Sequence, residues 1–150
     1  MTGQIPDEVI EFIREHTTMS LGTIGEQGEP QVADVYYAVG NDLGLYFVSS
    51  SKSRHTTNMS RDSRVAATIH NSGGDWQSIR GVQIQGHCTR LTGGSAIAAF
   101  ARYAAAYPYV LSDPTLVRAF KKVEMYRMAP NWIRWIDNSR SFGDYQEFHL

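Results

Sequence analysis

The residues best suited to chemistry form one run of hydroxyls and cations, Ser49-Ser50-Ser51-Lys52-Ser53-Arg54-His55. The run follows an apolar strand-like stretch and leads into a polar stretch without Gly or Pro, Lys52 to Arg61, where we expect a short helix. The first turn of a helix has unpaired N–H groups and the positive end of the helix dipole, both of which attract anions. With Lys52 and Arg54 beside it, this turn predicts a phosphate site. The alternative is an ordinary capped helix start with solvated charges.

The charge distribution points to the same segment. The 150 residues carry 14 Lys and Arg against 15 Asp and Glu, a formal net charge of −1. Residues 1–51 contain eight acidic residues and a single basic one, whereas residues 52–64 contain four basic residues and a single acidic one. The near-zero total argues against a general nucleic-acid binder and against a polybasic membrane anchor. The local basic density favours one anionic ligand.

The sequence gives less support for metal binding, haem ligation or nucleophilic catalysis. The histidines are scattered without metal-ligand spacing, so we expect no metal site, and a lone His does not by itself predict haem ligation. No GxSxG nucleophile motif occurs. Cys88 follows His87 in an alternating strand pattern that points the two side chains to opposite faces, so we expect Cys88 to be a core residue. No side chain can be assigned as a catalytic acid or base.

The elements that must position these residues are mainly strands. We expect strands over 19–25, 31–39, 45–50, 65–71, within the long stretch 76–91, and over 123–128 and 132–136, the last two separated by a turn at 129–131. Helices are expected over 7–16, 52–61, 95–107 and 115–122. This pattern predicts a mainly β chain, a six- to seven-stranded antiparallel barrel with short helices in a single domain over 1–150, with an N-terminal helix in 1–16 and a C-terminal tail at 137–150. With no signal peptide and no membrane span, the expected location is the cytoplasm.

The order of these segments resembles the pyridoxamine 5′-phosphate oxidase-like FMN-binding split-barrel family. The most specific segments are LYFVSSSKSRH and RGVQIQG, and the ending WIRWIDNSRSFGDYQEF is similar to the closing strand and Phe-Gly tail of that family. The resemblance covers residues 17–148 and is closest to an uncharacterised bacterial branch. The pyridoxamine oxidases proper have Arg-Gln-Val-Arg where this chain has Arg80-Gly81-Val82-Gln83, and basic residues where it has Asp34 and Ala38. These departures indicate that the chain is not itself a pyridoxamine phosphate oxidase.

The resemblance implies a homodimer that binds FMN at the subunit interface and acts as a flavin-dependent oxidoreductase on an unidentified small molecule. The residues implied for the phosphate are Ser49, Ser51, Lys52, Ser53 and Arg54. The residues implied for the ring are Ala33, Asp34, Val35, Tyr36, Val48, Val82 and Gln83. Another flavin, a deazaflavin or haem are the alternative cofactors, and a non-catalytic flavin- or haem-binding dimer is the alternative function. The long strand and the aromatic C-terminal segment independently favour a dimer, since they supply more apolar surface than one small barrel covers.

Overall fold

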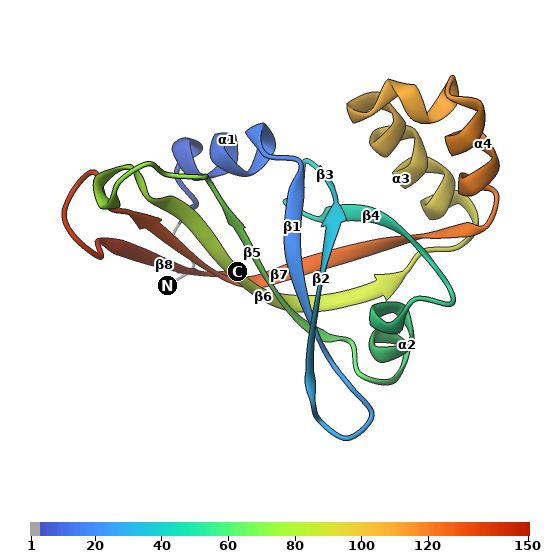
Figure 1. The fold of residues 1–150 in the computed structure, drawn as a ribbon, viewed down its shortest axis with the longest axis horizontal. Helices are drawn as coiled ribbons and strands as arrows, with labels where there is room; N and C mark the ends of the chain where they lie inside the picture. Colours follow the sequence, from blue (N-terminus) through green and yellow to red (C-terminus); the bar gives the residue numbers. More distant parts are fainter. Residues whose placement is uncertain (1–3) are drawn as a thin grey trace.

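The computed structural model describes residues 4–150, in which a curved antiparallel sheet is flanked by four short helices (Figure 1). The strands are β1 (Thr18–Ile24), β2 (Pro30–Tyr36), β3 (Ala38–Val39), β4 (Leu45–Ser50), β5 (Arg64–His70), β6 (Arg80–Arg90), β7 (Val123–Asp137) and β8 (Tyr145–His149). The helices are α1 (Asp7–Glu15), α2 (Arg54–Arg61), α3 (Gly93–Ala106) and α4 (Pro114–Phe120), with 3-10 turns η1 (Trp76–Ser78) and η2 (Pro108–Leu111). The predicted mainly β antiparallel split barrel with short helices is confirmed. Residues 1–3 of the predicted N-terminal segment lie outside the described residues.

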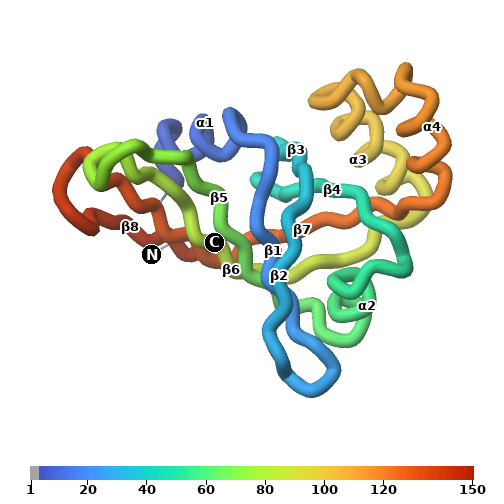
Figure 2. The backbone as a smooth tube through the Cα atoms, in the orientation of Figure 1, coloured from blue at the N-terminus to red at the C-terminus, as the bar shows by residue number. Residues whose placement is uncertain are grey.

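The sheet runs in the order β2-β1-β5-β6-β7-β4-β3, with β8 paired to β7. Its two edges, β2 and β3, are separated only by Tyr37, so the chain passes directly from one edge to the other (Figure 2). The prediction of one strand over 31–39 is therefore wrong. The Tyr37 N–H donates to Thr17 O at 2.9 Å and its hydroxyl to Ile13 O at 2.5 Å. These bonds mark the point where the chain stops pairing with β1, as β2, and begins to pair with β4, as β3.

The predicted turn at Ala129-Pro130-Asn131 is also wrong, because β7 is one continuous strand that contains a bulge. Gln85 pairs with Trp132 and Gly86 with Pro130, which leaves Asn131 as the extra residue. A bulge accommodates a proline that has no N–H for the ladder. Gly86 permits the close approach, since a Cβ there would lie 2.2 Å from Ala129 O. The bulge lets β7 bend along the barrel without ending.

The structure has eight strands within the described residues, more than the six or seven predicted. The difference arises because the stretch 31–39 divides, the last two predicted strands merge into β7, and the C-terminal tail contributes β8. Strand β8 pairs with β7 from Trp132 opposite His149 to Ile136 opposite Tyr145. Its side chains alternate between exposed and half-buried, as in a strand with one solvent face.

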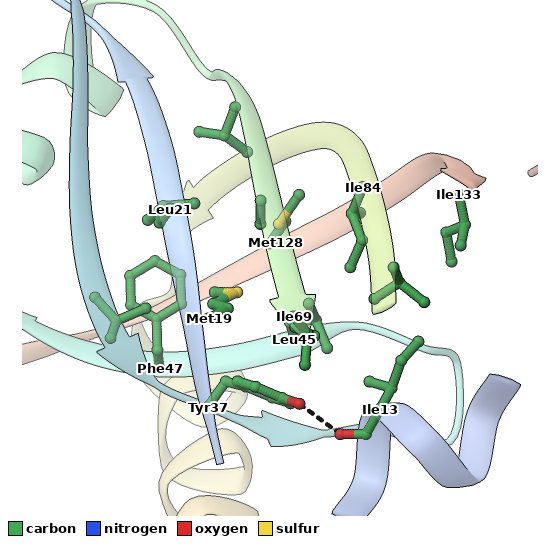
Figure 3. Close-up of a cluster of buried hydrophobic side chains, with 14 of the residues drawn as sticks. Ile13, Met19, Leu21, Tyr37, Leu45, Phe47, Ile69, Ile84, Met128 and Ile133 are labelled. Carbon is green, nitrogen blue, oxygen red and sulfur yellow. Dashed lines mark hydrogen bonds between the residues drawn. The ribbon is translucent and has the colours of Figure 1, made fainter. Parts of the chain in front are cut away.

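The main core lies inside the curved sheet and beneath α1. Figure 3 shows apolar side chains of β1, β4, β5, β6 and β7 converging there, with Tyr37 near Ile13 of α1. Cys88 is buried as predicted, and burial raises the pKa of its thiol to about 12. A second cluster lies beneath α3, where Tyr103 and Tyr107 pack with Met125 of β7. None of the helices within residues 4–150 is long and apolar enough to cross a membrane.

Candidate functional site

The serine-rich turn joins the end of β4 to the start of α2, as predicted, although the helix begins at Arg54 rather than at Lys52. Ser53 is the N-cap, and its hydroxyl oxygen accepts from Thr56 N at 3.3 Å. The same hydroxyl donates to Ser50 O at 2.9 Å. The side chains that were predicted to bind a ligand thus also fix the local backbone.

A hydrogen bond between Ser49 and His55 holds the turn on its buried side. Ser49 as a residue is only 8% exposed, and its hydroxyl oxygen lies 2.5 Å from His55 Nε2. Burial lowers the pKa of His55, because the protonated ring would lose its hydration. The pair therefore ties the last buried residue of β4 to the first turn of α2 through a neutral imidazole.

The outer side of the turn presents donors for an anion. The backbone N–H groups of Arg54 and His55 donate no hydrogen bond within residues 4–150. Lys52 is exposed and forms no ion pair with any described residue. Arg54 lies 3.6 Å from Glu29 of the β1–β2 hairpin, with 63% of its side chain exposed, so that pair is weak and replaceable. Free amides beside two exposed cations fit a phosphate group.

A groove of about 270 Å³ runs along α2 next to this turn. Its polar lining includes Ser51, Thr56, Thr57, Ser60, Arg90 and Tyr126. Glu124 also lines the groove and pairs with Arg90 at 3.0 Å. The hydroxyls of Thr56, Thr57, Ser60 and Tyr126 each form a hydrogen bond within the protein, so among the lining hydroxyls only that of Ser51 has no hydrogen-bond partner within residues 4–150. The groove extends the polar surface of the turn away from Lys52.

The residues of β2 that were predicted to contact the ring divide between two faces. Ala33 pairs with the fully buried Leu21, and Val35 is 8% exposed, so both point into the barrel. Asp34 and Tyr36 point outward, and Asp34 accepts a hydrogen bond from Ser20 at 2.6 Å. Strand alternation requires this division. Of the four predicted residues of β2, only Asp34 and Tyr36 are available to a ligand outside the barrel.

The remaining ring residues are dispersed as well. Val82 is 1% exposed and belongs to the main core, whereas Gln83 points outward from β6. Val48 packs against the cluster beneath α3. The structure therefore brings Ser49, Ser51, Lys52, Ser53 and Arg54 together with Val48 next to them, and it does not bring Gln83 into that group.

Gln83 lies instead in a hollow on the outer face of the sheet. Two adjoining depressions of about 530 and 330 Å³ share the lining residues Gly22, Val32, Ala66 and Gln85. These four residues and Trp132 form one cross-strand row over β2, β1, β5, β6 and β7, with its smallest side chains in the middle. No motif marks the hollow, and its signal in the sequence is only the small residues at alternate positions of β1 and β5.

A protein-family model described as pyridoxamine 5′-phosphate oxidase matches residues 5–136 of the chain. The chain belongs to this family. A UPF0306 protein of Enterobacter sp. (strain 638) is 26% identical over 121 residues, which are 80% of each protein. The family assignment agrees with the segment order that the sequence presents, from the hairpin of β1 and β2 to β7.

Solved structures of the same fold are described as binding different cofactors. A haem-binding protein of Mycobacterium smegmatis superposes with a TM-score of 0.74 at 17% identity, over 98% of this chain and 59% of that one. An FAD-binding protein of Mesorhizobium loti superposes with a TM-score of 0.67 at 16% identity, over 87% of this chain and 92% of that one. At these identities the likeness establishes the split-barrel fold, and the choice of cofactor depends on the residues of this chain.

Proposed function

We propose that the chain binds FMN, with the phosphate at the start of α2, and acts as a flavin-dependent oxidoreductase on a small molecule. The observation that carries the proposal is the turn itself, where the free N–H groups of Arg54 and His55 adjoin the exposed cations Lys52 and Arg54. FMN suits such a turn because its phosphate is a compact anion attached to a largely apolar ring system. When bound, a flavin supplies hydride and electron transfer, and the protein supplies orientation and surroundings.

A second copy of the chain would complete the proposed site. The hollow that contains Gln83 is lined by none of residues 48–54, so the proposed phosphate and ring contacts lie on separate surfaces of one chain. The outer sheet face around the hollow exposes 65% of Val32, an apolar residue suited to an interface. Light scattering coupled to size exclusion is expected to give the mass of two chains. A monomer at micromolar concentration would contradict the shared site.

Haem is the second candidate, and His87 is the residue that favours it. Its Nδ1 lies 3.0 Å from Ser63 Oγ, and its side chain lines the larger depression of the hollow. The other ring nitrogen has no hydrogen-bond partner within residues 4–150. An imidazole fixed through one nitrogen with the other free is the usual arrangement of an iron-ligating His.

The visible spectrum of the purified protein separates these proposals. Flavin bands that bleach on addition of NAD(P)H support the oxidoreductase, and a Soret band that disappears in His87→Ala supports the haem protein. A colourless protein that fails to bind added FMN or haem would overturn both.

Comparison of FMN with riboflavin as ligands tests the proposed phosphate site directly. The double variant Lys52→Ala, Arg54→Ala is expected to weaken FMN binding by about 1.5–3 kcal/mol per lost charged contact, or roughly 10- to 150-fold each. Riboflavin has no phosphate and should bind the variant and the wild type equally. The matched control is Lys121→Ala, Lys122→Ala, which removes the same charge from the segment after α4. Equal losses for FMN in both double variants would refute the assignment.

A further inference from the structure

A second cation-lined cleft lies on the opposite side of the barrel from α2, between the C-terminal ends of α1 and α3. Both helices contact β3, which lies between them (Figure 1). The cleft measures about 330 Å³, and β3 and Tyr37 line it together with the two helices. Its charged and titratable lining groups are Arg14, His16, Tyr37, Arg102 and Tyr107, with no carboxylate among them.

The two arginines of this cleft are unusual in the chain. Seven of its arginines form an ion pair with a carboxylate within residues 4–150, whereas Arg14, Arg61, Arg102 and Arg118 do not. Two of these four, Arg14 and Arg102, come from distant parts of the sequence and line the same cleft. Both side chains are exposed and are free to turn their guanidinium groups toward a ligand.

The floor of the cleft is neutral and rigid. Burial raises the pKa of Tyr107 to about 12 and the pKa of Tyr37 further, so both phenols stay protonated near neutral pH. The Tyr37 hydroxyl donates to Ile13 O, and the Tyr107 hydroxyl bonds to Tyr37 O and lies 3.2 Å from Thr17 O. These bonds fix α1, the junction between β2 and β3, and the segment after α3 relative to one another.

The carbonyl ends of α1 and α3 both adjoin the cleft and would repel an anion, and hydrogen bonds to these carbonyls reduce the repulsion. A helix C-terminus has a partial negative charge on its unpaired carbonyl groups. On α3, Tyr103 O accepts from Tyr107 N at 3.0 Å. On α1, Phe12 O accepts from His16 Nδ1 at 2.8 Å, and Ile13 O accepts from Tyr37. Because a carbonyl only accepts, His16 Nδ1 must carry the proton, and Nε2 has no hydrogen-bond partner within residues 4–150.

We propose that this cleft binds a small organic oxyanion, a carboxylate or phosphate, between Arg14 and Arg102. Guanidinium groups bind planar or tetrahedral oxyanions through paired N–H donors. The apolar part of the ligand lies against Tyr107, Ala38 and Val39, with His16 at the edge of the cleft. The cleft shares no lining residue with the turn at α2, so the two sites bind independently.

The test uses calorimetric or NMR titration of the full chain with phenyl phosphate, benzoate and uncharged benzyl alcohol. We expect at least one anion to bind in the millimolar range or tighter and benzyl alcohol to bind at least tenfold more weakly. Comparison of the two anions distinguishes a phosphate site from a carboxylate site. Failure of both anions to bind, or equal binding of the alcohol, would overturn the proposal.

Variants locate the binding within the cleft. Arg14→Gln and Arg102→Gln keep most of the side-chain stem and should each weaken binding of the anion at least tenfold. Arg118→Gln is the matched control, because Arg118 is also unpaired but lies on α4 outside the cleft lining. Equal weakening in Arg118→Gln, with melting temperatures unchanged in all three, would mean nonspecific charge attraction and would refute the site. Retained FMN binding in the cleft variants distinguishes this result from failure of the α2 turn.

Discussion

The turn at the start of α2 and the cleft between α1 and α3 both gather cations, but they are built in different ways. The turn consists of consecutive residues from Ser49 to His55, held by its own cap and by one Ser–His bond. The cleft joins Arg14 to Arg102 through packing of two helices on β3 and through two buried tyrosines. The geometry of the turn is therefore encoded locally, whereas the cleft exists only in the complete tertiary structure.

The largest expected effect comes from removal of the floor of the cleft. Tyr37→Ala should lower the free energy of unfolding by about 3–5 kcal/mol, because a fully buried aromatic ring and its hydrogen bond to Ile13 are lost together. The neighbouring Tyr36→Ala is the control, since Tyr36 is 54% exposed. Urea unfolding followed by circular dichroism measures both. Similar losses in the two variants would contradict the structural distinction between these adjacent residues.

The cap of the turn is expected to contribute less. Ser53→Ala should cost about 1 kcal/mol of unfolding free energy, because Thr56 N loses its acceptor. Ser53→Asp keeps the cap but places a carboxylate beside the proposed phosphate. We therefore expect Ser53→Asp to have near wild-type stability and weaker FMN binding. Unchanged FMN affinity in this variant would separate the cap from the ligand site and count against the proposed function.

The pH dependence of stability should reveal the neutral His55. Burial lowers its pKa in the folded state below the ordinary value of 6.5, so the unfolded chain binds more protons as the solution becomes acidic. The stabilisation is complete above pH 6.5 and is lost as the pH falls through the folded-state pKa. Unfolding free energies at pH 7.5 and 5.5 should therefore differ less in His55→Gln than in the wild type. A difference that is equal or larger in His55→Gln would disprove the assignment.

The smallest effect is expected from the surface ion pair that links α1 to the segment after β7. Arg140 lies 2.6 Å from Glu8, but about 45% and 38% of the two side chains are exposed. A double-mutant cycle with Arg140→Gln and Glu8→Gln should give a coupling energy of about 0.5 kcal/mol or less. A coupling above about 1 kcal/mol would mean that charge pairing, rather than the packing of Phe12 and Tyr37, positions the wall of the cleft.

This contrast also explains what could be predicted from the sequence. The turn was predictable because its hydroxyls, cations and helix start are adjacent in the chain. The cleft was not, because Arg102 stands in an Ala-rich helix where it has the pattern of a solvated charge. The division of the stretch 31–39 at Tyr37 was missed for the same reason, since only the tertiary bonds to Thr17 and Ile13 mark it.

The predicted turn at residues 129–131 was wrong for a different reason, because strand pairing overrides a strong local pattern. Pro130 and Asn131 are typical of a turn, yet pairing with β6 on one side keeps them in a bulged strand. The segment Tyr145 to His149 was missed because its apolar residues, Tyr145 and Phe148, are three apart and lack the period of two that predicts a strand, although its side chains alternate in exposure once it pairs with β7. The face on which Gln83 lies followed from strand alternation, but the hollow around it depends on five strands and could not be derived from any one segment.

The pairing of β4 with β7 has a consequence for the order of biosynthesis. Strand β4 is bounded by the two-residue strand β3 on one side and by residues 123–128 on the other. Its C-terminal end, which carries Ser49 and the turn, therefore has no long partner until the last quarter of the polypeptide has been translated. A nascent chain released before β7 would contain every residue of the phosphate turn and still lack its supporting strand. If the turn binds a cofactor as proposed, that binding would have to wait until β7 has been translated.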